Sequence, residues 1–323
     1  MEKPKSCAKK VSVLVPSFNE EKSLPIFYDK IKDMARELSM YDWEFLFVDD
    51  GSVDNTYNIL QSLINKDNCV SYISLSRNFG KENAMLAGFD YVRGDCTIIM
   101  DADLQDPPEL IPQMLKFWED GYLDVYARRR NRGKESWIRK HLSLLFYKIL
   151  DSTTKFEILQ NVGDFRLLDR QCIDALKQLR ESERYTKGMF CWIGFKKKEI
   201  LFDRADRVAG RSNWSFLSLF NLAIEGITSF TTAPLRFASI LGLSISVISF
   251  LYAIYFITKT LIFGDPIQGF TTIIVVVLFL GGIQLLTIGI LGEYIGKIFN
   301  ETKHRPVYIV KDYKSGHSSE QQE

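Results

Sequence analysis

The 323-residue chain is long enough for one large domain or two ordinary ones. Its 41 basic and 40 acidic side chains nearly cancel to a formal net charge of +1, so the total charge gives no sign of a nucleic-acid-binding protein. The three histidines and five cysteines show no metal-ligand spacing, which argues against a zinc hydrolase or a Ser-His enzyme and indicates reduced thiols in a cytosolic domain.

Strands and helices are expected to alternate along the first third of the chain. Short apolar runs predict four buried strands, at residues 11–15, 44–48, 70–75 and 97–100. Apolar residues at helical spacing predict four helices between and after them, at residues 19–38, 56–64, 81–92 and 107–118. Such alternation is typical of an α/β domain with a mostly parallel sheet that is covered by helices on both faces.

A polar cluster follows each of the four predicted strands. The clusters lie at residues 16–19, 49–52, 76–78 and 101–103. Ligands of parallel α/β sheets bind outside the carboxyl ends of the strands, which meet at one edge. The four clusters therefore predict a binding site at that edge, without reference to any protein family.

Asp101 and Asp103 are candidate metal ligands. Both can face a ligand if the strand ends in a turn there, as Pro107 and Pro108 indicate. Hard carboxylate oxygens suit Mg²⁺ or Mn²⁺, with a nucleotide diphosphate supplying further ligands while the ion neutralises the departing diphosphate. Taken alone, an Asp-x-Asp motif is more often a solvated acidic loop.

Asp49 and Asp50 form a second carboxylate pair, at the end of a neighbouring predicted strand. Carboxylates at this position can accept hydrogen bonds from a uracil ring N–H and from ribose hydroxyls. Gly51 permits a tight turn with close backbone approach. The structural alternative is a plain turn followed by a helix cap, a role that Asp54 can fill.

Two long apolar stretches predict membrane-spanning helices. Residues 237–258 and 266–292 contain no Asp, Glu, Lys or Arg, and a helix of roughly 20 apolar residues crosses a bilayer core. Basic residues flank the pair on both outer sides, whereas the link at 259–265 holds one lysine. The positive-inside rule then places both outer flanks and both termini in the cytosol. The apolar run at 11–15 is too short for a signal peptide, which agrees with a cytosolic domain.

Two further segments, residues 136–152 and 216–230, have amphipathic helical spacing. The first carries a tryptophan and several basic residues, which suits an anionic membrane surface as well as a helix packed on the sheet. An arginine run, Arg128 to Arg130 with Arg132, comes just before it and can grip a phosphate bidentately. The alternative for this run is a solvated, charged face.

Four strings of residues together resemble the ordered motifs of family 2 glycosyltransferases. They are Pro-Ser-Phe-Asn-Glu at 16–20, Val-Asp-Asp-Gly-Ser at 48–52, Leu-Ser-Arg-Asn-Phe-Gly-Lys-Glu at 75–82 and Asp-Ala-Asp-Leu-Gln-Asp-Pro-Pro-Glu at 101–109. Within that family the chain is similar, from about residue 11 to residue 308, to polyprenyl-phosphate glycosyltransferases of the dolichol-phosphate mannosyltransferase and bactoprenol glucosyltransferase types. The resemblance implies a GT-A fold and inverting transfer of a hexose from a nucleotide sugar to a polyprenyl phosphate at the plasma membrane. The substrates it favours are UDP-glucose and undecaprenyl phosphate.

The resemblance also implies roles for individual residues. The nucleotide sugar would be held by Pro16, Asn19, Glu20, Asp49, Asp50, Arg77, Lys81, Asp101 and Gln105. The metal, Mg²⁺ or Mn²⁺, would be bound by Asp101 and Asp103, and catalysis would involve Asp103 and Asp164, the latter as a base or an orienting group. The lipid phosphate would be contacted by Arg128, Arg129, Arg132, Arg207, Arg211 and Ser212, because an acceptor that is already ionised needs cations more than a base. Asn213 departs from the family pattern, which often has Lys there.

Four regions are expected along the chain. They are a nucleotide-sugar-binding part at 1–134, an acceptor part with interfacial helices at 135–232, two transmembrane helices at 233–296 and a cytosolic tail at 297–323, disordered after Lys314. Gly292 and Gly296 permit close helix contact in a homo-oligomer such as a tetramer. The expected partners are the lipid bilayer and a separate flippase or downstream transferase. No nucleic-acid partner is expected.

Several alternative functions stay open at this point. The first is a transferase of the same family that uses another sugar. The second is a processive polysaccharide synthase, which would need a Gln-x-x-Arg-Trp segment, and the chain has no Arg-Trp pair. A non-catalytic membrane-bound nucleotide-sugar sensor or scaffold is the third. A nucleotidyltransferase is the fourth, although the chain lacks a Gly-rich phosphate loop ending in Gly-Lys.

Overall fold

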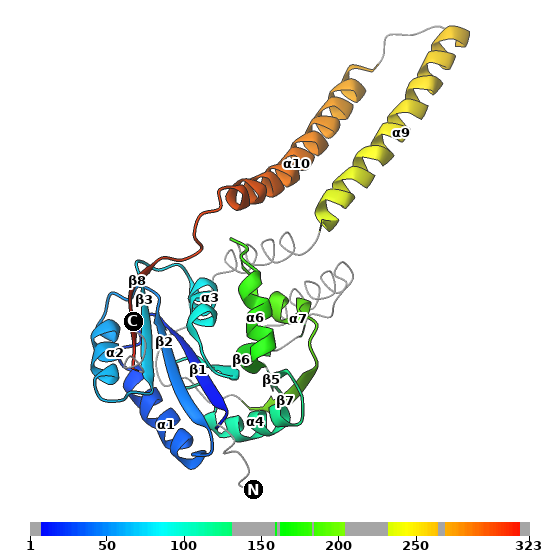
Figure 1. Ribbon diagram of the computed structural model, residues 1–323. Helices are drawn as coiled ribbons and strands as arrows, with labels where there is room; N and C mark the ends of the chain where they lie inside the picture. Colours follow the sequence, from blue (N-terminus) through cyan, green and yellow to red (C-terminus); the bar gives the residue numbers. More distant parts are fainter. Residues whose placement is uncertain are drawn as a thin grey trace. The chain divides into compact units, whose positions relative to one another are not determined.

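The computed structural model of the chain describes residues 8–130, 159, 162–182, 184–203, 232–263 and 269–316. The chain divides into two compact units. One unit holds a β-sheet with its covering helices and includes the residues after position 304, and the other holds two long helices (Figure 1). The predicted amphipathic segments at 136–152 and 216–230 lie outside the described residues.

The sheet contains eight strands among the residues described, in the order β7-β5-β6-β4-β1-β2-β3-β8. In chain order the strands are β1 (Lys10–Ser17), β2 (Asp42–Asp49), β3 (Val70–Leu75), β4 (Cys96–Ile99), β5 (Asp124–Arg129), β6 (Val162–Asp169), β7 (Lys197–Phe202) and β8 (Val310–Ser315). Strands β4, β1, β2 and β3 run parallel, as do β5 and β7, whereas β6 and β8 are antiparallel to their neighbours. The predicted α/β domain with a mostly parallel sheet is confirmed, and the four predicted strands form its parallel block.

Helices cover both faces of this block. The helices of the sheet unit are α1 (Leu24–Glu37), α2 (Thr56–Ile64), α3 (Lys81–Tyr91), α4 (Ile111–Glu119), α6 (Arg170–Gln178) and α7 (Thr186–Trp192), with a 3-10 turn η1 (Pro108–Leu110) before α4. Val13 of β1 belongs to the core that α1, α2 and α4 close. Its neighbour Leu14 faces α3, which approaches so closely that a Cβ on Gly88 would come within 2.1 Å of Leu14 Cδ1. The four predicted helices are confirmed.

The first helix begins at Leu24 rather than at residue 19. Its buried face, Leu24, Phe27, Ile31 and Met34, follows the predicted spacing. Asn19 has left-handed backbone geometry, with a φ of 57°, and its N–H donates to Ser52 Oγ at 2.9 Å. The residues after β1 are therefore held in a loop against the neighbouring loop and cannot start the helix.

Strands β5, β6 and β7 were not predicted, because charged residues interrupt their apolar pattern. The Arg128 guanidinium on β5 pairs with Glu199 on β7 at 3.1 Å. Arg166 on β6 pairs with Asp124 on β5 at 3.2 Å, and both side chains are almost completely buried. Pairing across the sheet satisfies these charges. Two arginines of the expected cationic run at 128–132, Arg128 and Arg129, thus belong to strand β5.

The segment after the second long helix is not simply a tail. Residues Val310–Ser315 form β8, which pairs antiparallel with β3 at the edge of the sheet. Asp312 of β8 accepts hydrogen bonds from the hydroxyls of Tyr57, at 2.7 Å, and Tyr72, at 2.6 Å. Disorder was expected after Lys314, but Ser315 lies in this strand, and residues 317–323 lie outside the described part of the chain.

Replacing Asp312 by Ala is expected to lower the free energy of unfolding by about 1–3 kcal/mol, because two tyrosine hydroxyls lose a charged acceptor. The bonds from Tyr72 and Tyr57 hold the pKa of Asp312 below its usual value, so this stabilisation is present at neutral pH and is lost as the pH falls through the lowered pKa. Urea unfolding of the full chain in detergent measures the loss. Asp33→Ala, on an exposed side chain of α1 paired only with Arg36 in the described structure, should change little, and an equal loss in both variants would contradict the role of Asp312.

The second unit consists of α9 (Ala233–Phe263) and α10 (Phe270–Thr302), which contact each other. Segments of both, Ala233–Tyr252 and Phe279–Thr302, are long and apolar enough to cross a membrane. Their surfaces expose large apolar side chains, as lipid-facing helices do. Both predicted apolar helices are confirmed as helices: α9 extends beyond the uncharged stretch at both ends, whereas α10 begins at Phe270, inside its stretch, and continues past the carboxyl end of it to Thr302.

Candidate active site

The predicted polar clusters meet at the carboxyl edge of the parallel strands. Asn19, after β1, binds the turn after β2 from both sides, since its Oδ1 also accepts the Val53 N–H at 2.9 Å. Asp50, after β2, accepts the Phe79 N–H from the loop after β3 at 2.7 Å. Lys81, which begins α3, pairs with Asp101 after β4. The four clusters therefore form one connected site, as their places at the strand ends predicted.

Asp49 and Asp50 hold the loops of this edge together. Asp49 is 1% exposed, and its two oxygens accept from the Ser52 N–H at 3.0 Å and from the Ser74 hydroxyl at 2.8 Å. Asp50 is 3% exposed and accepts the N–H groups of Phe79 and Gly80. Burial raises the pKa of Asp50, and the two N–H bonds counteract this. Both carboxylates, which the sequence predicted to bind nucleotide, hold the loops at this edge of the sheet in place.

Gly51 allows the turn after β2 to touch the loop after β3. Its φ is +69°, and a Cβ added there would lie 2.4 Å from the carbonyl carbon of Arg77. No side chain fits at that distance, and an L-residue is strained at this φ. The close approach fixes the position of the loop that leads into α3.

If a nucleotide sugar binds here, as the sequence predicts, we expect Gly51→Ala to raise its KM about tenfold, because the added Cβ must push the Arg77 backbone away from its present position. Gly121→Ala is a matched control, since Gly121 also has a positive φ, +88°, but a Cβ there meets nothing within 4 Å. Steady-state kinetics compares the two. An equal rise of KM in both variants would contradict a role for the close approach of Gly51 to Arg77, because strain from a positive φ is common to both positions.

An acidic cluster surrounds the end of β4. Glu20 and Asp106 both have raised pKa values, in each case first because of burial and then because of the charges of Asp101 and Asp103. The pKa of Asp106 rises to about 7. Carboxyl groups that suppress one another's ionisation mark a site of excess negative potential, which favours a cation.

The residues present fit a divalent cation held by Asp101 and Asp103. Among the residues that the structure describes, no three His, Cys, Asp or Glu side chains are grouped to enclose an ion. Two carboxylates that leave the remaining positions to a diphosphate and water are the usual arrangement for Mg²⁺ in phosphate chemistry. The excess negative potential and the hard oxygen donors agree with this assignment.

Lys81 joins the acidic cluster to Asp164. Its ammonium lies 2.6 Å from Asp101 Oδ1 and 2.6 Å from Asp164 Oδ2 on β6. Burial alone would lower the pKa of Lys81, but the two carboxylates raise it above its ordinary value. Burial would likewise raise the pKa of Asp164, yet Lys81 and then Lys187 on α7 outweigh it and lower that pKa. Asp164 is therefore ionised at neutral pH, and within the described structure its Oδ1 is buried without a hydrogen-bond partner.

The remaining predicted residues have varied positions. Pro16 is the second-to-last residue of β1, Gln105 is buried and donates its backbone N–H to Asp103 Oδ1 at 3.1 Å, and the Arg77 guanidinium lies over the Phe79 ring at 4.1 Å. Of the proposed phosphate ligands, Arg128 pairs with Glu199, and Arg129 Nε is buried with no hydrogen-bond partner in the described part of the chain. The others, Arg132, Arg207, Arg211 and Ser212, lie outside the described residues.

Glu82 is a residue of this region for which the sequence suggested no role. It follows Lys81 on α3, and its Oε2 accepts the N–H of Thr186 at the start of α7 at 2.8 Å. Burial and the charge of Asp164 raise its pKa. Glu82 thus ties α7, which carries Lys187, to the helix that carries Lys81. A Lys-Glu pair at a predicted helix start was the only signal, and it is too common to be diagnostic.

Two protein-family models match the chain. Residues 12–176 match glycosyl transferase family 2, and residues 233–298 match the GtrB C-terminal hairpin. The bactoprenol glucosyl transferase of Shigella phage SfV is 44% identical over 305 residues, which cover 94% of this chain and 99% of that protein. The prophage bactoprenol glucosyl transferase homolog of Escherichia coli (strain K12) is 42% identical, with the same coverage of both chains.

Solved structures align less closely. Glucosyl-3-phosphoglycerate synthase from Mycobacterium tuberculosis, in complex with Mn²⁺ and UDP-glucose, is 18% identical, with a TM-score of 0.43 over 68% of this chain and 77% of that one. A likeness this low says nothing of substrate or metal. The family match spans the residues that build the site, from β1 through α6, and the hairpin match spans α9 and most of α10. The chain is a member of glycosyl transferase family 2 and a glycosyltransferase that carries a GtrB-type C-terminal hairpin.

Proposed function

We propose that the chain transfers glucose from UDP-glucose to undecaprenyl phosphate, with inversion, at the cytosolic face of the plasma membrane. The observation that carries the proposal is the Lys81 ammonium, which brings Asp101 and Asp164 together at the carboxyl edge of the sheet. Relatives of 42–44% identity that match nearly the whole chain bear the name bactoprenol glucosyl transferase, and bactoprenol is a polyprenol. That name supports both the acceptor class and glucose.

Asp101 and Asp103 would hold the diphosphate end of the donor through Mg²⁺ or Mn²⁺. When bound, the ion supplies Lewis-acid stabilisation of the departing diphosphate. Lys81 adds a second positive charge next to Asp101, where negative charge builds up on the leaving group. The loops held by Asp49, Asp50 and Gly51 orient the nucleotide, so that the sugar is placed for in-line attack.

Asp164 is better suited to orient groups than to remove a proton. A phosphate monoester acceptor is largely ionised at neutral pH, since its second pKa is about 6. The pKa of Asp164 is below its usual value, which makes this carboxylate a weak base. Its ion pair with Lys81 instead holds the ammonium next to Asp101, where the donor would bind. The acceptor phosphate itself attacks the sugar, and the arginines at 128, 129, 132, 207 and 211 would neutralise it.

Strand β8 supports a topology in which both outer ends of the helical hairpin lie on one side of the membrane. The chain enters α9 from the sheet unit and returns after α10 to pair with β3 of the same sheet. If both helices cross the bilayer, the chain after α10 lies on the same side of the membrane as the chain before α9. The basic residues around the hairpin identify that side as the cytosol.

The proposal extends to assembly and to the fate of the product. A Cβ added at Gly292 or Gly296 on α10 would meet nothing within 4 Å in the described structure, so this face is open to another helix. We therefore propose that the chain forms a homo-oligomer through this face of α10. A lipid-linked glucose made on the cytosolic side also requires a separate flippase and a transferase that uses it beyond the membrane.

A donor panel tests the proposal. Full-length protein in detergent is incubated with undecaprenyl phosphate, Mg²⁺ or Mn²⁺, and one radiolabelled donor at a time: UDP-glucose, UDP-galactose, UDP-N-acetylglucosamine or GDP-mannose. We expect label in the lipid fraction with UDP-glucose above all. A preference for another donor corrects the sugar alone. Donor binding without lipid product from any donor would indicate a sensor or scaffold and overturn the function.

A further inference from the structure

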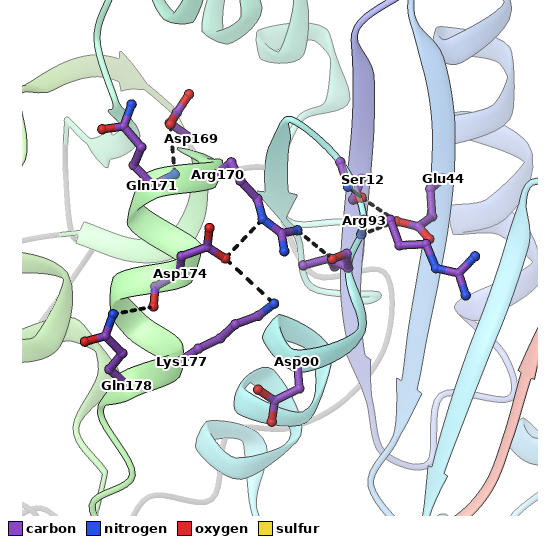
Figure 2. A network of polar contacts seen from close by, with 12 residues as sticks. Ser12, Glu44, Asp90, Arg93, Asp169, Arg170, Gln171, Asp174, Lys177 and Gln178 are labelled. Atoms are coloured by element: carbon purple, nitrogen blue, oxygen red, sulfur yellow. Dashed lines mark hydrogen bonds and ion pairs between the residues drawn. The ribbon is translucent and has the colours of Figure 1, made fainter.

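The sheet unit has a recess that the proposed reaction does not use. It has a volume of about 540 Å³ and is lined by the end of α3 at residues 90–93, by Arg170 and Lys177 of α6, and by Tyr313 of β8. Figure 2 shows Arg170 and Lys177 reaching from α6 toward the end of α3, with Asp174 between them. Three of the lining side chains, Arg93, Arg170 and Lys177, are cations, and one, Asp90, is an acid.

The recess lies at the opposite edge of the sheet from the proposed active site. Lys81 begins α3, and the recess is built at the other end of that helix, about 15 Å away at 1.5 Å per residue. Asp95, just beyond Arg93, hydrogen-bonds through its N–H to Lys10 at the start of β1, and its carbonyl accepts the Arg170 N–H. These are the amino ends of the parallel strands. A ligand there would be separate from the nucleotide sugar.

Cations outnumber carboxylates among the side chains that line the recess and their ion-pair partners, and one further carboxylate, that of Glu44, accepts the Arg93 backbone N–H at 2.9 Å. Four cations gather there, Arg93, Arg170, Lys177 and Arg180. Two carboxylates face them: Asp174 pairs with Arg170 at 3.1 Å and with Lys177 at 3.9 Å, and Asp90 pairs with Arg180 at 2.6 Å. Burial and then the charge of Arg170 lower the pKa of Lys177, whereas the charges of Asp174 and Asp90 act in the opposite direction.

The walls of the recess are held in place by bonds between three elements. Arg170 Nη1 donates to the Val92 carbonyl at 2.8 Å, and Arg93 Nη2 donates to the Tyr313 hydroxyl at 3.1 Å. The rings of Tyr91 and Tyr313 lie 4.6 Å apart. Fixed cations beside a phenol hydroxyl offer several donors to one ligand without a large loss of side-chain entropy.

We propose that this recess binds an anion of the phosphate-ester class through Lys177, Arg170 and Arg93. Phosphate oxygens accept hydrogen bonds from guanidinium and ammonium groups, which are the charged donors of these three side chains. Such a phosphate can come from a soluble ester or from the headgroup of an anionic lipid. The inference does not depend on the identity of the sugar or of its acceptor.

The experiment observes Lys177 directly. Lysines of the full chain in detergent are dimethylated with carbon-13, and the Lys177 signal is identified by its loss in Lys177→Gln. Inorganic phosphate is titrated in the presence of EDTA at constant ionic strength, with chloride as the reference anion. We expect a saturable shift of the Lys177 signal and a higher pKa of Lys177 in the phosphate-bound protein. A shift that grows linearly and equals the chloride effect would overturn the proposal.

Variants of the other cations establish where the phosphate binds. Arg93→Gln should raise the Kd measured at Lys177 about fivefold or more, the size expected for one lost charge contact near a surface. Arg170→Gln should do the same and provides a second test, since Arg170 also holds the Val92 carbonyl. Arg36→Gln, on an exposed pair of α1, is the control and should leave the Kd unchanged. Equal Kd values in all three variants would contradict the site.

Nanodiscs distinguish the two sources. The protein is placed in discs of phosphatidylcholine alone or of phosphatidylcholine with phosphatidylglycerol, without added phosphate. A shifted Lys177 signal in the second discs alone identifies a lipid headgroup as the source. An unchanged signal there, together with saturable binding of inorganic phosphate, identifies a soluble ester. Absence of both effects rejects phosphate binding in the recess.

Discussion

Asp103→Asn is expected to lower kcat for sugar transfer on the order of a thousandfold, because it removes one of the two carboxylates that we propose hold a metal ion and, through it, the diphosphate. Asp103 makes no ion pair with Lys81, so the Lys81 contacts with Asp101 and Asp164 should stay intact. The affinity for Mn²⁺, followed by electron paramagnetic resonance, should fall with kcat. The pKa values of Glu20 and Asp106 should fall as well, since the charge of Asp103 helps to raise both.

The matched control for this variant is Asp33→Asn, on an exposed carboxylate of α1. It should leave kcat, Mn²⁺ affinity and unfolding unchanged. Full transfer activity in purified Asp103→Asn would remove Asp103 from the metal assignment. Loss of activity with unchanged Mn²⁺ affinity would also contradict that assignment, because the effect would then not act through the ion.

Lys81→Met is expected to lower transfer by about a hundredfold to a thousandfold while raising the affinity for Mn²⁺ in the absence of donor. The ammonium pairs with Asp101 Oδ1 at 2.6 Å, so its removal frees a carboxylate that the proposed metal ion would use. The same change leaves Asp164 buried without its main counter-charge, and burial then raises the pKa of Asp164. The result is an active site that binds metal more readily and transfers sugar more slowly.

Lys30→Met, on the exposed surface of α1, controls for loss of a lysine. Lys81→Arg should recover part of the transfer rate, because a guanidinium keeps the charge between the two carboxylates. Mn²⁺ affinity that is unchanged or lower in Lys81→Met would show that Lys81 does not compete for Asp101. An unchanged transfer rate would remove Lys81 from the catalytic site.

The sequence was most informative where apolar runs and strand ends coincide. Strands β1 to β4 are mostly apolar, because both faces of a parallel block are buried, and each ends at a polar loop. Their order in the chain was enough to bring Asn19, Asp50, Lys81 and Asp101 to one edge. Parallel strands place their carboxyl ends together whatever the exact sheet order, so the site could be located before the topology was known.

The second half of the sheet could not be predicted in the same way. Strand β5 contains paired arginines, and the buried Arg166–Asp124 pair places a charge in the core, which an apolar pattern excludes. Strand β8 is stabilised by Asp312 and two tyrosines from segments more than two hundred residues away. Contacts of this kind depend on tertiary structure and leave no local periodicity. The ion pair between Lys81 and Asp164 is likewise a tertiary contact, although the sequence analysis predicted each of the two residues separately.

The most direct test of the account is sugar transfer by the reconstituted, full-length protein with radiolabelled UDP-glucose, undecaprenyl phosphate and Mg²⁺. The account predicts a lipid product in which the glucose is joined to the phosphate in the β configuration, formed only when the lipid phosphate is present and lost in Asp103→Asn. A product of α configuration would contradict the inverting mechanism. No lipid-linked product, from UDP-glucose or any other nucleotide sugar, would contradict the central claim.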